Sequence, residues 1–123
     1  MNNCPFCNLN TKIIKETETM LSFYDQYPVT EGHVLIIPKR HISDYFSMSN
    51  KEKTELDQLI NDLKKHLEVK YKNITGFNIG MNCGESAGQT IFHAHIHLIP
   101  RRDGDTKNPR GGVRGVIPEK MSY

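Results

Sequence analysis

Apolar and polar positions follow a strand-like pattern in four stretches of this chain. Residues 91–100 (IFHAHIHLIP) alternate three apolar residues with three histidines, as a half-buried β-strand does. Alternation of the same kind predicts strands over residues 20–25 (MLSFYD) and 74–82 (ITGFNIGMN). The apolar run of residues 33–38 (HVLIIP) predicts a buried strand that stops at Pro38.

A helical pattern occurs over residues 47–73. Ser49 and Glu52 form an S-x-x-E capping box at its start. Apolar residues then recur at helical spacing: Leu56, Leu59, Ile60, Leu63 and Leu67. Strands on both sides of one long helix predict an α+β fold with a mainly antiparallel sheet. The helix is expected to cover one face of that sheet and to leave the other face for a site.

The length of 123 residues predicts a single domain over residues 1–123. Residues 83–90 (CGESAGQT) form a glycine-containing loop, and the glycines and prolines of residues 102–123 predict an irregular tail. Six Lys and Arg against three Asp and Glu make residues 101–123 basic, although the whole chain has a net charge of only +2. This tail is either a solvated surface segment or a clamp for an anionic substrate, since arginine pairs well with phosphate.

Composition narrows the class of protein. The chain is 37% hydrophobic and 24% charged, and it lacks the apolar run of about 20 residues that a membrane span needs. The first ten residues do not follow the pattern of a signal peptide, so we expect a cytoplasmic protein. The small net charge gives no reason to expect a nucleic-acid partner.

The spacing of His93, His95 and His97 carries the candidate chemistry. On a strand these residues share one face, with neighbours about 6.5–7 Å apart. Imidazoles in a row suit a metal site, a nucleophile for phosphoryl transfer, or merely a polar surface. The preceding loop favours phosphate, because its glycines permit close approach and Gln89 and Thr90 offer donors.

These motifs resemble the histidine triad superfamily of nucleotide hydrolases and transferases. The resemblance runs from Phe23 to Arg101 and includes Asp25, GHVLIIPKRH, Asn82, AGQT and HAHIHLIPR. It implies a five-stranded sheet with one helix and a homodimer whose two sheets join.

The resemblance also implies a role for each matching residue. His95 is expected to attack the α-phosphorus of a purine nucleotide and form a nucleotidyl-histidine that water hydrolyses, without a catalytic metal. The other catalytic residues it implies are His33, His93 and His97. The substrate-binding residues are Asp25 for the ribose, Phe23 and Leu35 for the base, and Asn82, Gln89, Thr90 and Arg101 for phosphates and the leaving group.

The opening CPFC motif is compatible with redox chemistry, free thiols or a metal site. Some bacterial histidine triad proteins hold a structural zinc with such a pair, a histidine after the upstream strand and the first histidine of the row. The resemblance therefore implies a zinc site at Cys4, Cys7, His41 and His93, with residues 1–10 as the zinc-binding segment.

The sequence HLIPR after the histidines is similar to the dinucleoside polyphosphate hydrolase branch. The expected reaction releases AMP from diadenosine polyphosphates or from adenosine phosphoramidates, and arginines such as Arg101, Arg110 and Arg114 are expected to anchor a departing polyphosphate. A nucleotide-binding adaptor whose hydrolysis is incidental is the alternative function.

Overall fold

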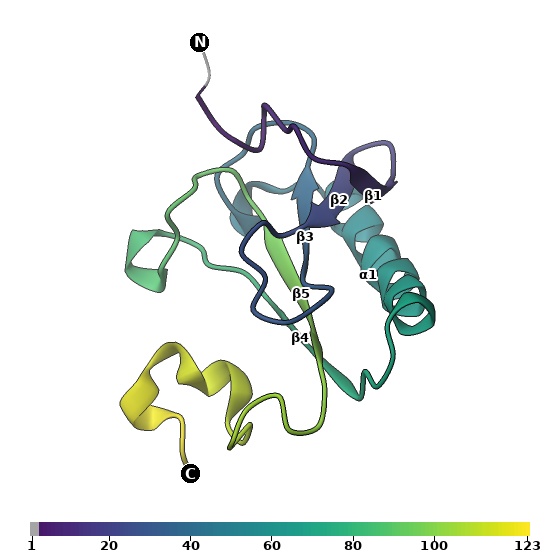
Figure 1. The fold of residues 1–123 in the computed structure, drawn as a ribbon. Helices are drawn as coiled ribbons and strands as arrows, with labels where there is room; N and C mark the ends of the chain where they lie inside the picture. The colour runs from purple at the N-terminus through teal and green to yellow at the C-terminus, as the bar shows by residue number, and fades with distance from the viewer. Residues whose placement is uncertain (1–2) are drawn as a thin grey trace.

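The structure is a computed structural model that describes residues 3–123. In this part of the chain, five strands form one antiparallel sheet in the order β1-β2-β3-β5-β4 (Figure 1). The strands are β1 (Ile13–Glu16), β2 (Met20–Tyr24), β3 (Val34–Pro38), β4 (Gly76–Gly80) and β5 (Ile96–Arg101). The predicted α+β fold with a five-stranded antiparallel sheet is therefore confirmed.

The long helix α1 (Asn50–Lys70) starts where the sequence predicts. Ser49 Oγ accepts a hydrogen bond from the Glu52 backbone N–H at 3.1 Å, and the Glu52 carboxylate accepts one from the Ser49 N–H at 2.7 Å. This reciprocal pair satisfies two donors that the first turn leaves without helical partners. Figure 1 shows α1 alongside the sheet. The buried leucines of α1 join a core cluster with residues from one face of that sheet.

Alternation along the central strands divides the buried residues between the two faces. Val34 and Ile36 of β3 join the core under α1, whereas Leu35 and Ile37 join a smaller cluster with Phe23 on the other face. His97 of β5 is paired directly with Leu35, and residues directly opposite one another share a face. The sheet thus presents His97 on the face that α1 leaves uncovered.

The prediction of a strand over the whole of residues 91–100 was wrong at its start, because β5 begins at Ile96. The backbone before it bonds to loops instead of to a neighbouring strand. The Ala94 N–H donates to the Ile42 carbonyl at 2.7 Å, and the Ile91 carbonyl accepts from the Gln89 side chain at 3.0 Å. Residues 91–95 therefore lack the ladder that a strand requires.

The tail is more ordered than an irregular segment. It contains two short 3₁₀ helices, η3 (Gly112–Val116) and η4 (Pro118–Lys120). Gly111 has a φ of +95°, and a Cβ there would lie 2.3 Å from the Met121 carbonyl oxygen, so glycine is required for the tail to fold back on itself. Within residues 3–123 we find no helix with the length and apolar character that crossing a membrane requires.

Candidate active site and metal centre

The three histidines lie close together where the chain enters β5. His93 is fully buried, and the ring centroids of His95 and His97 are 5.5 Å apart. Only His97 lies within the strand. The other two are held by bonds to β3 and the segment after it, from the His93 ring to the Pro38 carbonyl and from the Ala94 N–H to the Ile42 carbonyl.

The orientation of the His95 ring is fixed by its neighbour in the row. Its Nδ1 lies 2.9 Å from the backbone carbonyl of His93. A carbonyl can only accept, so Nδ1 carries the proton and donates, and the Nε2 lone pair remains for another partner. A neutral imidazole in this tautomer has the nucleophilic nitrogen that attack on phosphorus requires.

A chain of hydrogen bonds fixes His97 as the opposite tautomer from His95. The Val29 backbone N–H donates to His33 Nδ1 at 3.1 Å, so the proton of His33 resides on Nε2. This nitrogen lies 2.9 Å from His97 Nδ1, which accepts, and 3.4 Å from Asp25 Oδ2. His97 therefore presents a protonated Nε2 as a donor, next to the free lone pair of His95.

Burial disfavours the protonated forms of His97 and His33. Burial, together with smaller effects of the nearby His33 and His95, lowers the pKa of His97 to about 4. Burial also lowers the pKa of His33, although Asp25 opposes the shift. Ligand atoms of Asp25, His33 and His97 lie close enough to hold a metal, but the proton on His33 Nε2 faces the other two groups. We therefore interpret this trio as a hydrogen-bond chain.

A cavity of about 500 Å³ opens beside His95 and His97. Phe23 and Leu35 form its apolar floor, as predicted for the base, and Asp25 lies on its rim. The Asp25 carboxylate accepts from the Tyr27 N–H at 2.9 Å through Oδ1, which fixes the direction of the side chain. The expected base-binding and ribose-binding residues thus line one cavity with the expected nucleophile.

The loop before β5 is braced by a residue that we expected to bind phosphate. Gln89 is 3% exposed, and its side chain accepts from the Gly84 N–H at 2.8 Å and donates to the carbonyls of Ser43 and Ile91. This side chain holds the loop in shape. Thr90 is exposed beside it. Phosphate contacts from these two residues stay predictions.

A second cavity, of about 460 Å³, lies on the other side of His97. Asn82 and Arg101 line it, and the tail covers it with apolar side chains such as Val113 and Val116. The Arg101 guanidinium donates to both carboxylate oxygens of Asp105 at 2.8 Å and to Asn78 at 2.7 Å. Its charge is thus already paired with a carboxylate.

The other two arginines that we expected to anchor a polyphosphate lie over an aromatic ring. The guanidinium carbons of Arg110 and Arg114 are 4.7 Å and 5.0 Å from the ring centroid of Tyr123.

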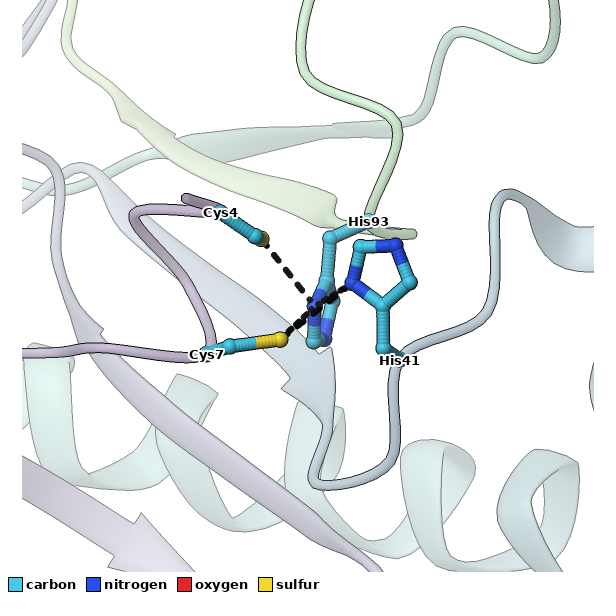
Figure 2. A group of neighbouring side chains, drawn as sticks. All are labelled: Cys4, Cys7, His41 and His93. Atoms are coloured by element: carbon cyan, nitrogen blue, oxygen red, sulfur yellow. Dashed lines mark hydrogen bonds between the residues drawn. The ribbon is translucent and has the colours of Figure 1, made fainter. Parts of the chain in front are cut away.

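Four side chains form a candidate metal centre beside the first cavity. Cys4, Cys7, His41 and His93 each bring one ligand atom to within 4.8 Å of the others (Figure 2). Each sulfur lies 3.5 Å from His93 Nδ1, Cys7 Sγ lies 3.2 Å from His41 Nδ1, and the two nitrogens are 3.2 Å apart. Tetrahedral zinc with bonds of about 2.3 Å to sulfur and about 2.0–2.1 Å to nitrogen sets such pairs roughly 3.3–3.6 Å apart. The residues therefore fit zinc.

The buried ligand His93 is oriented as a metal ligand requires. Its Nε2 donates to the Pro38 carbonyl at 2.8 Å, which leaves the Nδ1 lone pair directed at the cluster. With two cysteines and two histidines as ligands, a bound zinc would have no open position for a substrate, and it would serve to attach the N-terminal segment to the sheet. Residues 1 and 2 of the predicted zinc-binding segment lie outside the described residues.

One aromatic residue in this site was not among the predicted ones. Phe6 lines the first cavity, and its ring lies 5.1 Å from His95 and 5.6 Å from Phe23, between centroids. Its position between two cysteines in the sequence suggests a metal site and does not indicate that Phe6 lines a cavity. Only the folding of the N-terminal segment onto the sheet brings Phe6 to the site.

Comparison with known proteins gives the same picture. The profile of the HIT (histidine triad) domain family matches residues 7–104. The chain is 34% identical to an adenosine 5′-monophosphoramidase of Candida albicans. The alignment spans 113 residues and covers 85% of this chain and 74% of that protein.

Two solved structures are similar over most of the chain. A HIT family protein from Bacillus anthracis superposes with a TM-score of 0.79 at 31% identity, over 98% of this chain and 90% of that one. A zinc-bound histidine triad family protein from Mycobacterium smegmatis does so with a TM-score of 0.77 at 32% identity, over 86% and 80% of the two chains.

Proposed function

This chain belongs to the histidine triad family, and from that membership we propose that it hydrolyses nucleotides at the α-phosphate through a covalent nucleotidyl-His95 intermediate. The observation that carries the proposal is the pair of opposite tautomers. His95 has a free lone pair at Nε2, and His97 beside it presents an N–H. Nucleophile and donor thus face one cavity together with Asp25.

The proposed reaction has two displacements at phosphorus. His95 Nε2 attacks, the bond to the leaving group breaks, and the leaving group takes a proton from solvent. The positive charge that develops on the imidazole is stabilised by its Nδ1–H bond to the His93 carbonyl. Water then attacks, the P–N bond breaks, and AMP, one proton and neutral His95 are formed.

The His97 N–H is the group that we assign to the phosphate oxygens. A low pKa keeps this ring neutral, so it donates a hydrogen bond without a net charge. We assign the ribose hydroxyls to Asp25 and the purine to the floor formed by Phe23 and Leu35. The cluster of Cys4, Cys7, His41 and His93 is our proposed site for a structural zinc.

The leaving-group side supports adenosine phosphoramidates over diadenosine polyphosphates. A polyphosphate needs cations that are not already paired, whereas Arg101 is bound by Asp105 and the tail residues that line the second cavity, such as Val113 and Val116, are uncharged. The related protein from Candida albicans is a monophosphoramidase. We also propose a cytoplasmic location without nucleic-acid partners, as the composition predicts.

Turnover of two substrates tests this proposal. Purified protein is incubated with adenosine 5′-phosphoramidate and with diadenosine triphosphate, and AMP release is measured. We expect AMP from both, with a higher kcat/KM for the phosphoramidate. Nucleotide binding without AMP release would instead support the adaptor function.

A further inference from the structure

We propose that the metal cluster controls the nucleotide cavity, because the N-terminal segment that carries Cys4 and Cys7 is also one wall of that cavity. The ligand in this inference, an adenine nucleotide, rests on the proposed function. The coupling itself rests on contacts between the cluster, Phe6 and His95.

The wall is built from a segment without strand or helix. Between Asn3 and the start of β1 at Ile13, the chain forms only turns and bends. Within it, Pro5, Phe6 and residues 8–11 line the cavity. Backbone ladders do not hold this segment, so its position depends on side-chain contacts, among which the ligand positions of Cys4 and Cys7 are prominent.

Phe6 is the first link between the cluster and the cavity. It lies between the two cysteines in sequence, and its ring centroid is 6.0 Å from His93, 5.1 Å from His95 and 5.6 Å from Phe23. One ring therefore touches a metal ligand, the nucleophile and the floor of the base cavity. A shift of the cysteines moves this ring directly.

His93 is the second link. Its side chain joins the cluster through Nδ1 and the sheet through Nε2, while its backbone carbonyl accepts the Nδ1–H of His95. This link survives loss of the metal because the Pro38 bond is independent of it. We therefore expect metal loss to release the wall formed by Phe6 while His95 stays in place beside β5.

Two sites that are coupled in this way must affect each other equally. If zinc strengthens nucleotide binding by a given factor, the nucleotide strengthens zinc binding by the same factor. Phe6 is a positioning residue in this scheme, and without its ring the two affinities should become independent even though all four metal ligands remain.

The experiment compares the zinc-loaded protein with protein stripped by a chelator. AMP affinity is measured by calorimetry, and zinc affinity is measured by competition with a colorimetric chelator, with and without AMP. We expect AMP to bind about 5-fold or more weakly to the stripped protein, and AMP to raise zinc affinity by the same factor. Equal AMP affinities for the loaded and stripped forms would overturn the proposal.

Variants separate coupling from unfolding. Phe6→Ala should retain zinc, bind AMP weakly and lose the difference between loaded and stripped forms, and Phe6→Tyr should restore that difference. Phe46→Ala, which changes an 80% exposed phenylalanine, is the matched control. Coupling that persists in Phe6→Ala would contradict the role of the ring. If the stripped protein unfolds, the effect of AMP on zinc affinity is the measurement to which this criterion applies.

A second readout keeps the inference distinct from the proposed function. If the loaded protein does not bind AMP, the proposed function fails. The coupling is then read from the rate at which diethyl pyrocarbonate acylates His95, located by mass spectrometry. Stripping should accelerate this reaction, because the Phe6 ring then leaves the imidazole. An unchanged rate would overturn the coupling.

Discussion

Backbone groups determine what the histidines of this site do. The His93 carbonyl leaves the Nε2 lone pair of His95 free, and the Val29 N–H, acting through His33, makes His97 Nε2 a donor. The alternating spacing predicted that the three histidines lie near one another, but it carries no information on these tautomers. The tautomer of His95 depends on the His93 carbonyl, and that of His97 depends on Val29 and His33, which lie on a segment remote in sequence.

For His33, the role that the structure indicates differs most from the role that the sequence predicts. It is 2% exposed and bonds to His97, so we infer that it acts mainly by orienting His97. We expect His33→Ala to lower kcat on the order of 10²-fold with a small change in KM, because a misplaced catalytic group loses reactivity without loss of substrate contacts. His66→Ala on α1 is the control. An increase in KM at unchanged kcat would show that His33 binds substrate directly.

Acid should destabilise the folded protein through His97. The ring has a pKa of about 4 when folded, against 6.5 ordinarily, so between these values the unfolded chain binds a proton that the folded protein does not bind. This stabilisation is complete above pH 6.5 and is lost as the pH falls toward 4. Melting temperatures at pH 7 and pH 5 should therefore differ less in His97→Gln than in wild type or His66→Gln. Identical differences in all three proteins would contradict the assignment.

At the scale of elements, a boundary set by residues close in sequence was predicted well, and a boundary set by strand pairing was predicted less well. The start of α1 follows from Ser49 and Glu52, which are three residues apart and bond to each other. The start of β5 depends instead on whether a neighbouring strand reaches residues 91–95. Within the described chain the paired positions of β5 stop at Ile96 on the β3 side and at His97 on the β4 side, and alternation alone could not reveal this.

The capping box predicts a measurable loss of stability. Ser49→Ala removes the acceptor for the Glu52 N–H, and loss of an N-cap side chain costs about 1 kcal/mol. Urea unfolding should show this decrease in the free energy of unfolding at an unchanged slope. The exposed Ser122→Ala should leave it unchanged. A loss in Ser122→Ala equal to that in Ser49→Ala would refute the cap.

At the scale of the molecule, two cavities meet at His97, one bounded by the N-terminal segment and the other by the tail. The sequence predicted the residues that strands carry into this site, such as Phe23, Leu35 and His97. It did not predict Phe6 or the covering tail, because segments without regular structure reach the site only through long-range contacts.

The sheet also supports the predicted homodimer. β4 lies at one end of the sheet, and its Ile79 is 50% exposed. An uncovered edge strand favours pairing with another chain. We expect light scattering to give about twice the chain mass of 14.1 kDa at micromolar concentration. A monomer mass under these conditions would contradict the dimer.

The central claim is that His95 becomes covalently attached to the nucleotide. The most direct test mixes the protein with adenosine 5′-phosphoramidate, quenches the reaction within one turnover in alkaline denaturant, which preserves a P–N bond, and maps the adduct by mass spectrometry. We predict a nucleotidyl group on His95 in the wild-type protein, and neither adduct nor turnover in His95→Ala. AMP formation by His95→Ala at a rate close to that of wild type would contradict the account.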